Sequence, residues 1–240
     1  MEEIRQPMTA EAAVSGIEAN MRGLMAGLRL LPGAEVVDRP EMLRFLTGAP
    51  FPLFNGVVGA RLAAGGVDTA IDAALAPFRE RGVPMLWWVG PSSEPADLGA
   101  RLEARGLVHA DASSGMAVDL AALTAPPALP GGLTIEPVRD AAALRDYTAA
   151  LVAGFGLPPE AGEWTFDLCR RAGFGDAMPT NYLARLDGVP VATAMLALFG
   201  GVAGVWNVAT VPGARRRGSA RRSRGRPWPM RARGGIGSPC

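Results

Sequence analysis

The chain has 240 residues, of which 49% are hydrophobic and 20% charged, with a formal net charge of +1. This composition is ordinary for a soluble globular protein with one large domain or two small ones. Two cysteines exclude a disulfide framework and favour a reducing, cytoplasmic location, and a single histidine, His109, excludes a poly-histidine metal site. No signal peptide is expected, because the first ten residues are acidic and lack an apolar core.

The residues before position 124 alternate between helical and strand patterns. Apolar Ile71, Leu75 and Phe78 share one face of a predicted helix that Gly82 ends. The apolar run PMLWWVG predicts a buried strand. In chain order we predict a helix at 11–28, strands at 35–37, 42–46 and 56–62, helices at 67–81 and 95–106 around a strand at 84–90, and a last strand or hairpin arm at 109–120.

A Pro/Gly-rich stretch, TAPPALPGG at 124–132, predicts a linker between two domains. The pattern after it predicts a strand at 133–138, helices at 141–156 and 163–172, and strands at 181–188, 189–199 and 202–211. Asp187-Gly188 and Gly200-Gly201 have the turn chemistry of β-hairpins.

An uncharged run of 27 residues, 188–214, is long enough to cross a bilayer. Pro190, Pro212 and the central glycine pair interrupt it, and it is rich in β-branched residues. We therefore predict two buried strands joined by a tight turn and no membrane association.

The loop after the last predicted strand carries a phosphate-binding pattern. Residues 215–220, Arg-Arg-Arg-Gly-Ser-Ala, fit Arg/Gln-x-x-Gly-x-Gly/Ala. Backbone N–H groups that turn inward at small residues can cradle phosphate oxygens, and arginine side chains add charge-assisted hydrogen bonds. The alternative is a solvated arginine cluster on a turn.

The segment VWNVATVPGARRRG, placed after a strand, two helices and a three-stranded meander, resembles the acetyl-CoA-binding core of the GCN5-related N-acetyltransferase superfamily. The resemblance implies an α/β fold, with a mixed, mostly antiparallel sheet flanked by helices. It implies that the strand residues Val208, Ala209, Thr210 and Val211 bind the pantetheine arm of acetyl-CoA. It also implies that Arg216, Arg217, Gly218, Ser219 and Ala220 hold the pyrophosphate, and that no metal is needed.

The first half of the chain has the element order of the later part of such a domain, which predicts two tandem copies. Where its phosphate loop would lie, Arg61 and Gly65 are one residue too far apart, so no cofactor is expected there. The alternative is that FPLFNGV and PMLWWVG are only two buried strands.

The sequence after Gly218 does not continue the family pattern. It contains Pro227, Pro229 and several glycines, which prevent the long amphipathic helix that should follow the loop. We predict a one-base deletion near the Gly218 codon, which leaves a truncated second domain and a disordered tail. Nine arginines lie between 215 and 233 and no acid follows Asp187, so a native tail could instead bind RNA or anionic lipid non-specifically.

Few other side chains suggest chemistry. Phe54 and Asn55 could line a substrate pocket, although turn chemistry at Asn55-Gly56 explains them as well. Asn207 could orient an amine or a water molecule. No catalytic residue is assigned. A structural role is predicted for four further residues, His109, Cys169, Trp87 and Trp88.

Together these features predict four segments: a degenerate acetyltransferase-like domain at 1–123, a linker at 124–132, a truncated acetyl-CoA-binding domain at 133–218, and an arginine-rich tail at 219–240. The predicted activity is acetyl transfer from acetyl-CoA to a primary amine on a small molecule or peptide, impaired by the missing region. The alternatives are a non-catalytic remnant and a basic-tailed nucleic-acid-binding protein.

Overall fold

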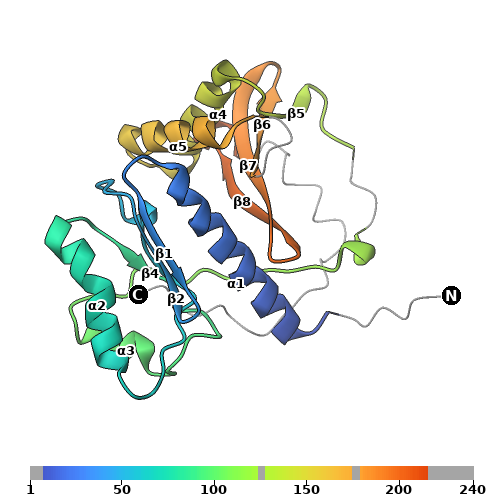
Figure 1. The fold of residues 1–240 in the computed structure, drawn as a ribbon. Coiled ribbons are helices and arrows are strands. Elements are labelled where there is room, and N and C mark those ends of the chain that lie inside the picture. Colours follow the sequence, from blue (N-terminus) through green and yellow to red (C-terminus); the bar gives the residue numbers. More distant parts are fainter. Residues whose placement is uncertain (1–7, 124–127, 175–178, 216–240) are drawn as a thin grey trace. The chain divides into compact units, whose positions relative to one another are not determined.

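The computed structural model describes residues 8–123, 128–174 and 179–215, which form two compact units (Figure 1). Unit 1 comprises the described residues up to 123 together with Gly200–Val202, and unit 2 comprises the other described residues. The predicted pyrophosphate loop, Arg216–Ala220, and the predicted tail at 219–240 lie outside the described residues.

Unit 1 contains a four-stranded sheet with the order β1-β2-β3-β4. The first three strands are antiparallel, whereas β4 runs parallel to β3 after the crossover helix α2. Its elements are α1 (Ala10–Ala26), η1 (Gly27–Leu30), β1 (Glu35–Arg39), β2 (Met42–Leu46), η2 (Pro52–Phe54), β3 (Asn55–Val58), α2 (Val67–Arg81), β4 (Leu86–Trp87), α3 (Leu98–Glu103) and η3 (Leu120–Ala122).

The core of unit 1 forms where the sequence periodicity places apolar side chains. Ile71, Leu75 and Phe78 lie on the buried face of α2 and pack with Trp87, which is fully buried. Gly82 ends α2 in the left-handed conformation, with a φ of 61°. The predicted helix, its end and the burial of Trp87 are therefore confirmed.

Three strand predictions in unit 1 differ from the structure. The strand expected at 56–62 ends at Val58, because Gly59 has a φ of 64° and turns the chain. The strand expected at 84–90 keeps only Leu86–Trp87. The strand predicted at 109–120 is wrong: residues 107–119 form neither strand nor helix and are mostly exposed, with 88% exposure at Met116. Small and polar residues there give a strand no apolar face to bury.

Asn55 begins β3, and its buried side chain holds the loop before it. Its Oδ1 accepts hydrogen bonds from the N–H groups of Thr47 and Gly48, at 2.9 and 3.2 Å. Its Nδ2 donates to the carbonyl oxygens of Ala49 and Pro84, at 2.8 and 3.0 Å. Because both ends of this amide are engaged, the β2–β3 loop depends on one side chain.

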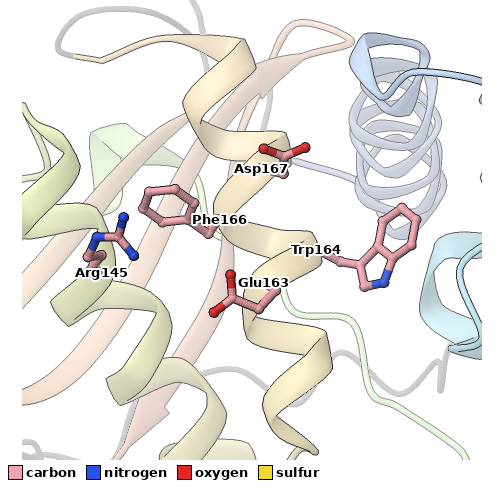
Figure 2. Close-up of a pocket in the computed structure, with 5 residues that line it drawn as sticks. All are labelled: Arg145, Glu163, Trp164, Phe166 and Asp167. Atoms are coloured by element: carbon pink, nitrogen blue, oxygen red, sulfur yellow. The ribbon is translucent and has the colours of Figure 1, made fainter.

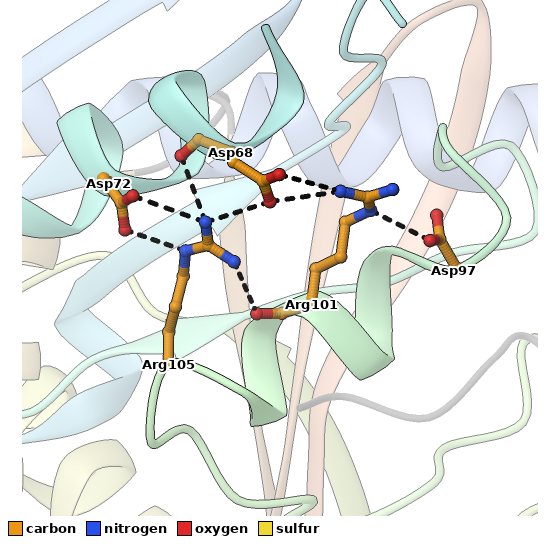
Figure 3. A network of polar contacts seen from close by, with 5 residues as sticks. All are labelled: Asp68, Asp72, Asp97, Arg101 and Arg105. Carbon is orange, nitrogen blue, oxygen red and sulfur yellow. Dashed lines mark hydrogen bonds and ion pairs between the residues drawn. The ribbon is translucent and has the colours of Figure 1, made fainter.

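A charged network joins α2 to α3 on the surface of unit 1 (Figure 3). Arg101 contacts Asp68 and Asp97 at 3.0 and 2.9 Å. Arg105 contacts Asp68 and Asp72 at 2.9 and 2.8 Å. Hydrogen bonds from the two guanidinium groups hold the pKa of all three carboxyl groups below the ordinary 3.8.

Unit 2 contains a second four-stranded sheet, with the order β5-β6-β7-β8. Helix α4 packs on β6 and β7, and α5 packs on α4. The elements are β5 (Leu133–Pro137), α4 (Ala141–Phe155), α5 (Pro159–Ala172), β6 (Thr180–Leu186), β7 (Val189–Phe199), β8 (Val202–Thr210) and η4 (Pro212–Ala214). The predicted α/β class, with mostly antiparallel sheets flanked by helices, is confirmed.

The uncharged run at 188–214 is the hairpin of β7 and β8, as predicted. Gly200 and Gly201 both have positive φ angles, of 60° and 75°, which a two-residue hairpin turn requires. Asp187 and Gly188 form the preceding turn in the same way, with φ of 50° and 81°. In the part of the chain that the structure describes, no helix is long and apolar enough to cross a membrane.

The contacts of Asn55 predict a large loss of stability when its side chain is removed. Asn55→Ala leaves buried backbone donors and acceptors without partners, at about 1–3 kcal/mol each, so the free energy of unfolding should fall by at least about 2 kcal/mol. Urea unfolding followed by tryptophan fluorescence measures it. Leu53→Ala, at a half-exposed position of the same loop, is the control. Equal effects of the two substitutions would contradict this role.

The charged network between α2 and α3 should contribute to the stability of the folded protein in a pH-dependent way. A carboxyl group whose pKa is lowered by folding stabilises the folded protein at every pH above its pKa in the unfolded chain. This stabilisation is lost as the pH falls through the lower pKa of the folded state. The double substitution Arg101→Gln and Arg105→Gln should therefore destabilise the chain at pH 7 and lose its effect in acid. Urea unfolding over a pH series tests this, and a pH-independent difference would assign the effect to packing of the arginine stems.

Candidate functional site

The strand β8 is one of the two outer strands of the unit 2 sheet. It has one neighbour among the described strands, β7, so its other edge carries main-chain groups that no described strand pairs. Val205 and Val208 on this strand are 67% and 62% exposed. In unit 1, by contrast, β3 is buried at every residue and pairs on both edges.

β8 is kinked at Asn207. This residue has a φ of 53°, in the left-handed region that non-glycine residues rarely occupy. A uniform ladder from the Gly200-Gly201 turn would place Val191 opposite Thr210, but the N–H of Val211 donates to the Val191 carbonyl, at 2.9 Å. The one-residue shift and the angle together identify a β-bulge.

Three buried side chains contact Asn207. The hydroxyl of Thr193, on β7, donates to the Asn207 carbonyl at 2.7 Å. The Asn207 Nδ2 lies 3.5 Å from the Tyr147 hydroxyl and 3.8 Å from the Met195 sulfur. Burial, the largest effect, raises the pKa of Tyr147 far above its ordinary value, so this hydroxyl is neutral.

The segment after β8 is tied to the end of α4. Arg215 donates from Nε to the Thr210 carbonyl at 3.0 Å, and from Nη2 to the Gly154 carbonyl at 2.6 Å. A Cβ atom at Gly154 would lie 2.7 Å from the Ala209 side chain, so only glycine permits this approach. The first arginine of the phosphate-binding pattern thus caps a helix end.

The predicted cofactor residues in β8 occupy different environments. Val208 is exposed, Ala209 is buried against α4, and Thr210 and Val211 are half-buried. Their shared feature is the open edge, where main-chain groups can pair with an extended ligand that carries amides. Beyond them, Arg216–Ala220 lie outside the described residues.

The three predicted substrate residues do not come together within one unit. Phe54 and Asn55 belong to unit 1, and Asn207 belongs to unit 2. The Asn55 amide holds its own loop and has no group left for a ligand. Sequence reasoning missed Tyr147 and Thr193, although a threonine inside the apolar run VPVATAMLALF was a usable signal.

Unit 1 has a strand, β3, followed by a loop and the helix α2, and hydrogen bonds close this loop. The N–H of Trp88 donates to the Val57 carbonyl at 2.9 Å, which joins β4 to β3. Further along, the Glu94 N–H donates to Ala60 and the Leu62 N–H donates to Glu94, both at 3.0 Å. These bonds join the segment after β3 to the segment after β4, so these main-chain groups already have hydrogen-bond partners.

The side chains near this loop are also occupied or acidic. Arg61 donates to the Ser92 hydroxyl at 2.9 Å and lies 4.0 Å from Glu18. Asp68 is in the first turn of α2, where a carboxylate opposes a bound anion. The side chains at this loop of unit 1 are therefore poorly suited to bind a phosphate group.

A surface pocket of about 370 Å³ lies between α4 and α5 (Figure 2). The Arg145 guanidinium lies 4.8 Å from the centre of the Phe166 ring. Asp167 is paired with Arg170 and Arg171, at 3.1 and 3.4 Å. Arg145 and Asp167 are therefore both engaged by other side chains of these two helices.

Cys169 and His109 lack the environment of catalytic groups. Cys169 is buried beside α4, and burial raises the pKa of its thiol to about 11, so it remains protonated at neutral pH. His109 is exposed in the segment after α3. Among residues 8–123, 128–174 and 179–215, no group of three or more metal-ligating side chains is present.

The sequence matches no protein-family model and no curated protein. Among solved structures, it is similar to a GCN5-related N-acetyltransferase from Kribbella flavida, with 20% identity over 85% of this chain and 76% of that one and a TM-score of 0.63. A GCN5-related N-acetyltransferase from Sphaerobacter thermophilus shares 18% identity over 89% of this chain and 77% of that one, with a TM-score of 0.49. The first similarity confirms the fold prediction: this chain has the fold of a GCN5-related N-acetyltransferase.

Proposed function

We propose that the chain binds acetyl-CoA on unit 2 and belongs to the N-acetyltransferases, which transfer the acetyl group to a primary amine. The observation that carries this proposal is the open, bulged edge of β8, which leads directly into a cationic loop. The pantetheine arm would lie along Val208–Val211 and pair with the strand edge. The pyrophosphate would bind the N–H groups and the side chains of Arg216–Ala220.

The proposed chemistry is direct transfer. A neutral amine nitrogen attacks the thioester carbonyl, the carbon–nitrogen bond forms, and the carbon–sulfur bond breaks. The amine loses a proton, and the departing thiolate gains one. Neither the buried thiol of Cys169 nor the buried hydroxyl of Tyr147 is placed to exchange these protons, and we assign no catalytic residue.

We also propose a tandem arrangement in which unit 2 alone holds the cofactor. In unit 1, β3 is followed by the helix α2 and the parallel strand β4, which closes the sheet on that side. The residues after Gly218 contain no apolar periodicity from which to build the same helix and strand. Loss of that region by a frameshift would leave acetyl-CoA binding in place and impair transfer.

Two alternatives remain distinct in their chemistry. A non-catalytic remnant would bind CoA weakly or not at all and would acetylate no amine. A nucleic-acid-binding protein is favoured by the nine arginines between 215 and 233. It would bind polyanions with a strong salt dependence and no requirement for the loop sequence.

Paired arginine substitutions separate these functions. Arg216→Ala with Arg217→Ala removes two cations from the proposed loop, whereas Arg231→Ala with Arg233→Ala removes the same charge from the distal tail. Hydrogen bonds to charged groups are worth about 1.5–3 kcal/mol, so the loop pair should weaken CoA binding at least about tenfold. The tail pair should leave it within about threefold, as measured by isothermal titration calorimetry on the full chain.

Two results of the calorimetry would contradict the proposal. Absence of CoA binding by the parent chain would remove the acyltransferase function. Equal weakening by the two pairs would show that binding depends on overall charge. Acetylation of an amine panel, with and without the reading frame restored after Gly218, then distinguishes an impaired enzyme from a remnant.

A further inference from the structure

We infer that Asn207, Thr193 and Tyr147 form an anchor that sets the position of the β8 edge, and that they are positioning residues of the acetyl-CoA site. This inference rests on the proposed function, because it names the residues that shape its binding strand. None of the three is expected to touch the reacting atoms.

The backbone of Asn207 is the centre of the anchor. A left-handed conformation is unfavourable for an L-residue, and asparagine and glycine tolerate it best. Within β8, Asn207 is the non-glycine residue that adopts it. The conformation therefore needs contacts that oppose a return to regular strand geometry.

Thr193 supplies the first of these contacts. At a bulge the regular ladder is interrupted, and a carbonyl group there needs another donor. The Thr193 hydroxyl donates to the Asn207 carbonyl at 2.7 Å. Thr193 is itself buried on β7, opposite Leu183 of β6, so the donor is fixed by the interior of the sheet.

Tyr147 and Met195 supply the second contact, at the side chain. The Asn207 amide nitrogen faces the Tyr147 hydroxyl and the Met195 sulfur, both on buried side chains. Tyr147 lies on α4, and the same helix contacts β8 again where Gly154 meets Ala209. The bulge is thus held by Thr193 of β7 and by Tyr147 of α4.

The anchor determines which side chains of β8 are exposed. In a regular strand, side chains three positions apart point to opposite faces. In β8 Val205 and Val208 are both strongly exposed, because the extra residue between them shifts the alternation. Straightening the bulge would turn the residues from Val208 to Val211 by one position, and these residues form the proposed pantetheine site.

Substitutions at Asn207 separate backbone geometry from side-chain chemistry. Asn207→Gly keeps the left-handed conformation and the carbonyl that Thr193 bonds, but it loses the amide contact with Tyr147, so CoA binding should weaken about threefold. Asn207→Val disfavours that conformation, and CoA binding should weaken at least tenfold. The Kd is measured by isothermal titration calorimetry on the full chain, and circular dichroism follows the unfolding midpoint.

Thr193 gives an independent test that does not alter the bulged residue. Thr193→Val removes the hydroxyl at nearly constant volume and should weaken CoA binding at least fivefold, whereas Thr193→Ser should restore it. Thr148→Val is the matched control. It loses a buried threonine hydroxyl that bonds only to carbonyl groups of its own helix, and it should leave the Kd unchanged.

The outcomes separate this inference from the proposed function. If the parent chain binds CoA and Asn207→Val and Thr193→Val bind it equally well, the anchor is overturned and the function stands. If Thr148→Val weakens binding as much as Thr193→Val, general destabilisation explains the effect and the anchor is overturned. If the parent chain binds no CoA, the proposed function fails and the positioning role fails with it.

Discussion

The hydrogen bond from the Thr193 hydroxyl to the Asn207 carbonyl is the interaction on which the candidate site depends. An edge strand has main-chain groups that must pair with water, with another strand or with a ligand. The bulge at Asn207 bends this edge, and Thr193 and Tyr147 hold the bend from the interior. The result is a strand whose exposed side has a defined geometry before any ligand arrives.

The strand β3 of unit 1 and the strand β8 of unit 2 differ in how their edges are paired. In unit 1, β3 is buried at every residue, and β4 and the bonds between Ala60, Leu62 and Glu94 close its outer edge. In unit 2, β8 has exposed valines and one described neighbour. Among the described residues, the strand backbone is therefore paired on both edges in unit 1 and on one edge in unit 2.

Sequence periodicity predicted most of the helices and the three-stranded meander of unit 2, because those elements bury one regular apolar face. It failed at 109–120, where small and polar residues give a strand no apolar face to bury. The sequence left open whether Asn55 lines a substrate pocket or serves local turn chemistry, and the structure shows that the amide holds its own loop. Such roles depend on contacts between distant residues, which a local pattern does not contain.

The candidate site was predictable in part. The strand and the arginine-rich loop were visible as adjacent segments, so Val208–Val211 could be proposed from the sequence. The bulge could not, because Asn207 is contacted there by Thr193 and Tyr147, which are 14 and 60 positions away. Arg215 is similar: in sequence it belongs to the loop, but in the structure it caps α4.

Hydrogen–deuterium exchange of the full chain, with and without CoA, tests the central claim most directly, because it reports on both units in one experiment. The account predicts slower exchange in β8 and in the residues from 211 to 220 when CoA is bound. It predicts no change in the loop of unit 1 at 59–66. Unchanged exchange throughout β8, or protection of 59–66 in its place, would contradict the account.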